Sequence, residues 1–318
     1  MGLIDACWPR RYDPAKIYQW FGRGGGADGS PTPRPAGVEV KLNIKPLHPV
    51  FAAEITGIDL RTPPPAELRR AIDDAMDEYA VVVVRDQLLD DDQHLAFARA
   101  MGPLEPAPAV VDAYLHRLKH REMVDISNLN LDGSVLAVDD RRRMFNLGNL
   151  LWHSDSSFKT TPAKYSMLHA RVIPPAGGET EFADMRAAYD ALPDAEKSRI
   201  ETLVCDHSLI YSRALLGFDD WTPEEAKEFA PVPQRLVRRH AGSGRRSIYL
   251  SAHIGTIHGW PRPEAMVVVR ELMEQATQPR FVYRHEWRIH DLVIWNSRGT
   301  MHRARPFDDT STSATCAA

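Results

Sequence analysis

The sequence is poor in cysteine, and this scarcity excludes folds that depend on cysteine for their stability. Its 318 residues include three cysteines, Cys7, Cys205 and Cys316, which are too few and too scattered for a disulfide framework or a zinc knuckle. Stability must therefore come from an ordinary core. Hydrophobic residues make up 43% of the chain, which is enough to form one.

Long apolar runs and an excess of one charge are also absent. No stretch approaches the roughly 18 apolar residues of a membrane span. Charges at Asp5, Arg10 and Arg11 precede any apolar segment, unlike a signal peptide. The 39 Lys and Arg residues nearly balance 43 Asp and Glu residues, which argues against a nucleic-acid surface. We therefore expect a cytoplasmic protein with no membrane or nucleic-acid partner, and a homo-oligomer remains possible.

Residues 1–37 differ in composition from the rest of the chain. They are rich in glycine and proline, so we expect a flexible extension before a single domain at 38–318. The extension contains a G-x-G-x-x-G pattern at Gly24, Gly26 and Gly29. A dinucleotide loop requires a strand before this pattern and a helix after it. Alternating prolines follow instead, so we do not interpret the pattern as a nucleotide site.

Short strand-like runs recur along the second half of the sequence, with helical patterns between them. Because no regular βαβ alternation occurs, we predict a mainly β fold with helical inserts, a double-stranded β-helix (jelly roll). Residues 103–145 are irregular and polar, which suggests an active-site loop or lid. The expected strands are 81–84, 164–173, 246–250, 281–287 and 292–295, and the expected helices are 65–79, 90–101, 185–192, 195–203, 222–229 and 263–276.

The sharpest chemical motif is Trp152-His153-Ser154-Asp155. In a strand, alternate side chains point to the same face, so we expect His153 and Asp155 to share one. A second histidine would complete the facial triad of non-haem Fe(II) oxygenases, and His302 is the candidate because it follows an apolar strand. The simpler alternative for the pair alone is a hydrogen-bonded His–Asp pair at a strand end.

Several other polar and aromatic residues have less specific interpretations. Arg213 could hold a substrate carboxylate, but a solvated or structural arginine is an equal alternative. We expect His207 and His253 to be core or surface histidines, and Trp295 to be a core residue beside the His302 strand.

From about Leu47 to Asp309 the sequence resembles the iron- and 2-oxoglutarate-dependent taurine / 2,4-dichlorophenoxyacetate dioxygenase family. More narrowly, it is similar to bacterial aryloxyalkanoate (phenoxypropionate-type) dioxygenases. Five segments carry the resemblance: Ile55–Leu60, Val84–Gln87, Asn146–Asn149 leading into His153-Ser154-Asp155, Gly177–Met185 and Met301–Arg303.

The resemblance implies a role for each matched residue. Fe(II) would be bound by His153, Asp155 and His302, and the Thr180 hydroxyl would bind a carboxylate of the co-substrate 2-oxoglutarate. Asn149 would line the substrate side. An ordinary strand-edge threonine is the alternative for Thr180.

The resemblance also implies the reaction. With O2, a small carboxylate substrate would be hydroxylated. If this substrate is an aryloxyalkanoate, hydroxylation beside the ether oxygen leads to collapse into a phenol. A sulfonate (taurine-type) dioxygenase is the alternative within the class. A zinc hydrolase would keep the same ligands, but the chain has no H-E-x-x-H motif.

The C-terminal residues depart from the family pattern. The family places an arginine for 2-oxoglutarate about eleven to fifteen residues after the second histidine, whereas residues 311–318 contain no cation. Losing a charge-assisted pair to a dicarboxylate weakens its binding. We therefore expect a chain truncated or altered after residue 309. The alternative function is a catalytically impaired jelly-roll protein that binds metal but holds 2-oxoglutarate poorly.

Overall fold

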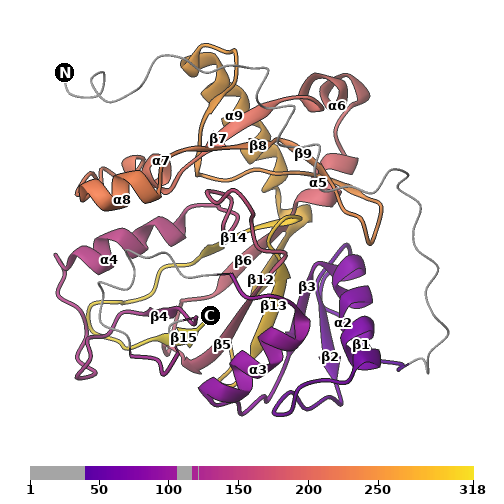
Figure 1. The fold of residues 1–318 in the computed structure, drawn as a ribbon, viewed down its shortest axis with the longest axis vertical. Coiled ribbons are helices and arrows are strands. Elements are labelled where there is room, and N and C mark those ends of the chain that lie inside the picture. The colour runs from indigo at the N-terminus through magenta and orange to yellow at the C-terminus, as the bar shows by residue number, and fades with distance from the viewer. Residues whose placement is uncertain (1–39, 106–116, 121) are drawn as a thin grey trace. The chain divides into compact units, whose positions relative to one another are not determined.

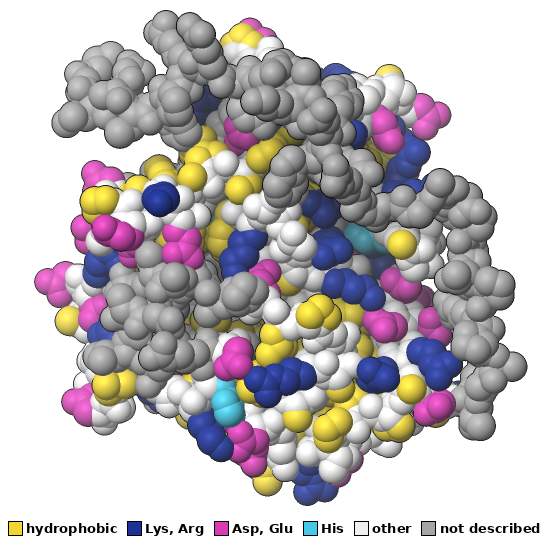
Figure 2. Space-filling model, viewed as in Figure 1, with side chains coloured by type: hydrophobic (Ala, Val, Ile, Leu, Met, Phe, Trp, Pro, Cys, Tyr) yellow, Lys and Arg dark blue, Asp and Glu magenta, His cyan; other side chains and the backbone are white. Residues whose placement is uncertain are grey.

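The computed structural model describes residues 40–105, 117–120 and 122–318, shown as a ribbon in Figure 1. The expected N-terminal extension and its glycine pattern lie outside the described residues. Within the described part of the chain, no helix is both long and apolar enough to cross a membrane. On the face that Figure 2 shows, basic and acidic side chains are interspersed rather than gathered by sign.

A seven-stranded sheet forms the larger of two sheets that position the site. Its strands lie in the order β1-β2-β3-β13-β5-β15-β4, and every pair is antiparallel except β2 with β3. The bounds are β1 (Asn43–Pro46), β2 (Ala53–Thr56), β3 (Val81–Val84), β4 (Asp125–Ser127), β5 (Tyr165–Val172), β13 (Leu292–Asn296) and β15 (Thr315–Ala317).

Alternation along the central strands explains why this sheet is covered on both faces. On β3 and β13, Val81, Val83, Val293 and Trp295 face one apolar cluster, whereas their alternate neighbours face another. The second cluster includes buried residues of α2 (Ala66–Tyr79) and α3 (Asp91–Met101). Runs such as Val81–Val84 are therefore apolar at every position because both faces are buried.

The second sheet contains two of the candidate site residues, Thr180 and His302. It has the order β12-β6-β14, with bounds β12 (Val282–His285), β6 (Thr180–Asp184) and β14 (Thr300–Ala304). Phe182 from the centre of β6 packs in the same cluster as Trp295 of the large sheet. The two sheets thus face each other across a shared apolar layer.

A further layer contains two small sheets and most of the remaining helices, above the two main sheets in Figure 1. The sheets are β11-β7-β8 and β10-β9. The strand bounds are β7 (Val204–His207), β8 (Val232–Arg235), β9 (Val237–Arg239), β10 (Arg246–Ile248) and β11 (Ile254–Ile257). The helices are α5 (Met185–Asp190), α6 (Asp194–Ile200), α7 (Leu209–Ala214), α8 (Pro223–Glu228) and α9 (Arg262–Ala276).

Most sequence-based element predictions agree with the structure, and cap residues explain why. Asp90 forms a capping box with Gln93 at the start of α3, and Thr222 forms one with Glu225 at the start of α8. The helices predicted to reach residues 192 and 203 end at Asp190 and Ile200. Pro193 explains the first difference, because the residue before a proline disfavours helical backbone.

Two predictions were wrong. Residues 103–145 are not irregular throughout, because they include β4 and the start of α4 (Arg141–Asn146), whose N-cap Asp140 accepts from the backbone N–H of Arg142. The strand predicted at 281–287 is shorter than expected, since a 3₁₀ turn occupies Pro279–Phe281 and β12 ends at His285.

Candidate metal centre

His153 and His302 are direct partners in an isolated antiparallel bridge. The N–H of His153 donates to the carbonyl of His302 at 3.0 Å, and the N–H of His302 donates back at 2.8 Å. Residues opposite each other in such a pair project to the same side. The ring centroids are accordingly 4.2 Å apart. Two histidines separated by 149 positions are therefore held together by the backbone itself.

Asp155 completes the group. Its Oδ1 lies 3.8 Å from Nε2 of His153 and 3.7 Å from Nε2 of His302. One ligand atom from each of the three residues lies within 4.8 Å of the others. The expectation that His153 and Asp155 alternate along a strand was wrong, because His153 forms only the bridge and Asp155 begins a turn. The turn, rather than strand alternation, brings the carboxylate back toward the imidazoles.

The imidazole of His153 is oriented to offer Nε2 to a metal. Its Nδ1 lies 2.7 Å from the carbonyl of Leu151. A carbonyl only accepts, so Nδ1 carries the proton and Nε2 keeps its lone pair. His302 also directs Nε2 toward Asp155. Two neutral imidazole nitrogens and one carboxylate oxygen are the donor set that suits Fe(II) in a facial triad.

Burial and charge favour the protonation states that metal ligands need. Removal from water lowers the pKa of His153 and of His302, so both imidazoles are neutral near pH 7. Burial alone would raise the pKa of Asp155. The adjacent imidazoles of His302 and His153 outweigh it, and the net pKa is lowered.

Trp295 is a buried core residue, as the sequence predicted, and it also contacts the candidate ligands. Its Nε1–H donates to Oδ2 of Asp155 at 3.0 Å, and its ring lies 4.9 Å from that of His302. The indole therefore holds one carboxylate oxygen and leaves the other directed at the imidazoles. Nothing in the sequence pattern distinguished Trp295 from an ordinary buried aromatic residue.

Thr180 lies on the same face of the second sheet as His302. In the β14–β6 register His302 is opposite Phe182 and Ala304 is opposite Thr180. Positions two apart on a strand share a face, so Thr180 lies on the same face as Phe182, the residue opposite His302. The two positions are about 7 Å apart along the strand. Thr180 is buried, and its Oγ1 accepts from Nε1 of Trp287 at 3.0 Å.

Arg213 is not a solvated arginine, because only 4% of the residue's surface is exposed. Its guanidinium donates to Ser212 Oγ at 3.1 Å and lies 3.5 Å from Oδ1 of Asn149. None of the ion pairs in the described residues includes Arg213, and its Nε has no partner there. Burial lowers the pKa of Arg213 to about 10. The cation is therefore still charged near pH 7 and lacks a counter-ion in the described part of the chain.

Aromatic rings and a glycine shape the surroundings of this cation. Cζ of Arg213 lies 4.4 Å from the centroid of the Phe145 ring, which packs edge-on against Phe218 and Trp221. A Cβ added at Gly148 would lie 2.4 Å from Cζ of Arg213. Glycine at this position is thus required for the guanidinium to occupy its place.

His253 connects this cation to the metal centre. It is buried, as His207 is, so of the two expected environments, core or surface, both histidines occupy the core. Nδ1 of His253 lies 2.9 Å from Ser212 Oγ, and its ring lies 5.9 Å from that of His153. The predicted site residues therefore converge: the three candidate ligands form one group, Asn149 contacts Arg213, and Thr180 lies on the face that carries His302.

The fold and site together define a mixed α/β protein with several sheets, in which two histidines and an aspartate could hold a metal ion. Residues 43–315 match the model of the family described as "Taurine catabolism dioxygenase TauD, TfdA family". The match spans most of the chain, and the chain belongs to this family.

Individual relatives agree with this assignment. The chain is 48% identical over 263 residues to the alpha-ketoglutarate-dependent 2,4-dichlorophenoxyacetate dioxygenase of Cupriavidus pinatubonensis, covering 83% of this chain and 92% of that protein. It is 38% identical to the (S)-phenoxypropionate/alpha-ketoglutarate-dioxygenase of Sphingobium herbicidovorans, covering 85% of this chain and 91% of that protein. The crystal structure of AAD-2 in complex with Mn(II) and N-oxalylglycine matches with a TM-score of 0.80 and 49% identity, covering 88% of this chain and 96% of AAD-2.

Proposed function

We propose that the chain is an Fe(II)- and 2-oxoglutarate-dependent dioxygenase that hydroxylates an aryloxyalkanoate and so releases a phenol. His153, Asp155 and His302 would hold the iron, and the convergence of their ligand atoms within 4.8 Å is the observation that carries the proposal. When bound, ferrous iron with 2-oxoglutarate supplies the activation of O2. The names of the relatives support the substrate class.

Thr180 is assigned to the far carboxylate of 2-oxoglutarate. The keto-acid end of the molecule chelates a metal, and its second carboxylate lies several bonds away. The separation of about 7 Å between the Thr180 and His302 levels of the sheet suits a dicarboxylate that spans from the metal to this hydroxyl. The two sheets would form the halves of a double-stranded β-helix around this space.

Arg213 and Asn149 are assigned to the carboxylate of the substrate. A buried cation costs free energy unless an anion pairs with it. Among the described residues Arg213 has only neutral partners, so a bound carboxylate would complete its coordination. Phe145 lies beside the cation and packs against Phe218 and Trp221, and these rings offer apolar area to an aryl ring.

Succinate release by purified protein loaded with ferrous iron tests the enzyme class. We expect release to depend on 2-oxoglutarate and to be stimulated by 2,4-dichlorophenoxyacetate or a phenoxypropionate more than by taurine. Stimulation by taurine instead would favour the sulfonate alternative. Failure of every carboxylate and sulfonate in the panel would overturn the proposal.

The second candidate is a metal-binding protein with impaired 2-oxoglutarate binding. Residues 311–318 contain no cation. In the described residues, the side chain that donates to Thr180 Oγ1 is Trp287, and not an arginine. Calorimetry separates the two candidates. The impaired protein would bind Mn(II) but show no heat on addition of 2-oxoglutarate, whereas the enzyme would bind both.

A further inference from the structure

The hydrogen bond between Trp287 and Thr180 determines which further hydrogen bonds the threonine hydroxyl can form. Trp287 Nε1 lies 3.0 Å from Thr180 Oγ1. An indole N–H can only donate, so Oγ1 is the acceptor in this bond. The hydroxyl proton therefore remains available for a further acceptor. Thr180 is 8% exposed, so an acceptor inside the fold has little competition from bulk water.

The ring of Trp287 is itself held by His285. The two rings meet edge to face, with centroids 4.5 Å apart and planes at 89°. His285 lies opposite Thr180 in the β12–β6 register, so it lies beside the hydroxyl that Trp287 reaches. His285 is fully buried, which leaves its ring no room to move without displacing neighbours.

Hydrogen bonds fix the orientation of the His285 ring. Nε2 of His285 lies 3.1 Å from Oδ2 of Asp291, a buried carboxylate that also pairs with the Arg85 guanidinium. The carboxylate accepts, so Nε2 of His285 donates and its Nδ1 is left as an acceptor. The hydroxyl of Tyr283 lies 3.1 Å from that Nδ1 and donates to it. Both ring nitrogens are thus committed, and one tautomer is favoured.

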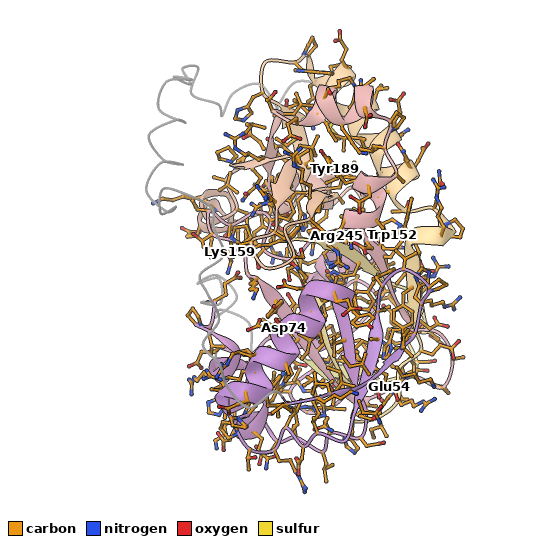
Figure 3. The ribbon with its side chains drawn as sticks, turned by 90° about the vertical axis from the view of Figure 1, so that its right-hand side faces the viewer. Glu54, Asp74, Trp152, Lys159, Tyr189 and Arg245 are labelled. Atoms are coloured by element: carbon orange, nitrogen blue, oxygen red, sulfur yellow. The ribbon has the colours of Figure 1, made fainter. Side chains whose placement is uncertain are left out.

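This network continues from Asp291 to a second, partly buried carboxylate. Arg85 also pairs with Glu54, with Nε to Oε2 at 3.3 Å. Figure 3 separates Glu54 from Trp152, the residue before His153, along the vertical direction of the view. The network therefore links the Trp287–Thr180 pair, through His285 and Asp291, to Arg85 and Glu54.

We propose that Trp287 is a positioning residue for 2-oxoglutarate: it fixes the Thr180 hydroxyl as a donor toward the far carboxylate of the keto acid. The role rests on the proposed function, because it requires 2-oxoglutarate to bind between the metal centre and Thr180. A hydrogen bond from a hydroxyl to a carboxylate is charge-assisted, so its loss has a measurable effect on affinity.

The test is a double-mutant cycle on the dissociation constant of 2-oxoglutarate, measured by calorimetry with Mn(II) bound. Trp287→Phe keeps an aromatic ring and removes the N–H. We expect it to raise the dissociation constant about tenfold in the wild-type background. In a Thr180→Ala background it should change the constant less than twofold, since its partner is already absent. Equal effects in the two backgrounds, or no effect in the wild type, would overturn the role.

A matched control separates positioning from a general loss of packing. Trp260 is a half-buried tryptophan that packs against a different apolar cluster. Trp260→Phe should leave the dissociation constant of 2-oxoglutarate unchanged. The affinity for Mn(II) should be the same in all these variants. A fall in Mn(II) affinity on Trp287→Phe would show that the indole acts on the whole site and would overturn the specific role.

An NMR measurement reads the hydrogen bond without any ligand. The indole N–H signal of Trp287 is identified by its loss in Trp287→Phe. We expect it to shift in Thr180→Ala and to stay in place in Thr180→Ser, and an unshifted signal in Thr180→Ala would refute the bond. If wild-type protein binds no 2-oxoglutarate, the proposed function and the positioning role both fail. If it binds normally but Trp287→Phe has no effect, only the positioning role fails.

Discussion

Trp295 and Asp155 are joined by a hydrogen bond that divides the two carboxylate oxygens between different tasks. Oδ2 accepts from the indole at 3.0 Å, whereas Oδ1 lies 3.7 Å from Nε2 of His302. A carboxylate held by one oxygen presents the other as a single ligand. The tryptophan thus orients a candidate metal ligand without touching the metal position itself.

We expect Trp295→Phe to weaken metal binding about 10- to 100-fold, because loss of a residue that orients a ligand typically costs that much affinity. The ring and most of the packing are kept, so the fold should persist. Calorimetric titration with Mn(II) measures the change, and Trp287→Phe serves as the control with unchanged metal affinity. Equal metal affinity in Trp295→Phe and wild type would contradict the orienting role.

Removing a ligand should have a larger effect than removing its support. His302→Ala is expected to lower Mn(II) affinity by more than a hundredfold, since one of three protein ligands is lost. His120, which pairs with Asp92 near the surface, offers a control histidine outside the group. His120→Ala should bind Mn(II) as the wild type does. Retention of tight binding in His302→Ala would show that the metal lies elsewhere.

Gly148→Ala should disturb substrate binding through Arg213. The added Cβ would lie 2.4 Å from Cζ of Arg213, so the guanidinium must move. We expect the KM for 2,4-dichlorophenoxyacetate to rise at least about tenfold, with the dissociation constant of 2-oxoglutarate unchanged. Gly217→Ala is not a suitable control, because φ is +77° there and alanine would be strained. Gly102→Ala, with open space around its Cβ position, is the better comparison.

The sequence predicted the strands of the core more successfully than the geometry of the site. Val81–Val84 and Leu292–Trp295 are apolar at every position, and their short length and β-branched residues favour a buried strand. The metal centre depends instead on the bridge between His153 and His302, a pairing between distant residues that local periodicity does not encode. The family resemblance pointed to the three candidate ligands, but not to the turn that brings Asp155 to the two histidines.

The supporting residues were harder still to anticipate. Trp295 and Trp287 each donate one hydrogen bond, to Asp155 and to Thr180. In the sequence both are simply aromatic residues in or near apolar strands. Which side chain an indole N–H reaches depends on how two sheets pack, and this information is distributed over the whole core.

Arg213→Met should stabilise the protein while impairing its activity. The guanidinium is buried, and none of its hydrogen-bond partners in the described residues is an anion. Replacing such a cation with an apolar side chain of similar length removes a desolvation cost of about 1–3 kcal/mol. Urea unfolding should therefore show a higher midpoint, and the KM for the aryloxyalkanoate should rise sharply. A lower midpoint would mean that the cation has an anionic partner within the protein.

Histidines packed between α3 and the large sheet make stability depend on pH. The ring of His94 lies 5.9 Å from that of His169, which stacks on His290 at 6.0 Å. Burial, followed by the charge of His169, lowers the pKa of His94 to about 3, and burial lowers that of His169 as well. In the unfolded chain these imidazoles take up protons near pH 6.5. The unfolded state therefore binds more protons between about pH 3 and pH 6.5, and acid shifts the equilibrium toward it.

We expect the free energy of unfolding to be fully maintained above pH 6.5 and to fall as the pH is lowered. For His94 alone the loss is about 1.4 kcal/mol between pH 7.5 and pH 5.5. His94→Gln keeps a polar side chain that does not titrate, so urea unfolding at the two pH values should show a difference smaller by about that amount. Gln93→Ala removes the α3 capping box without removing a titrating group. Gln93→Ala should lower the free energy of unfolding equally at both pH values. If His94→Gln kept the pH dependence of the wild type, this histidine would be excluded as a source of acid sensitivity.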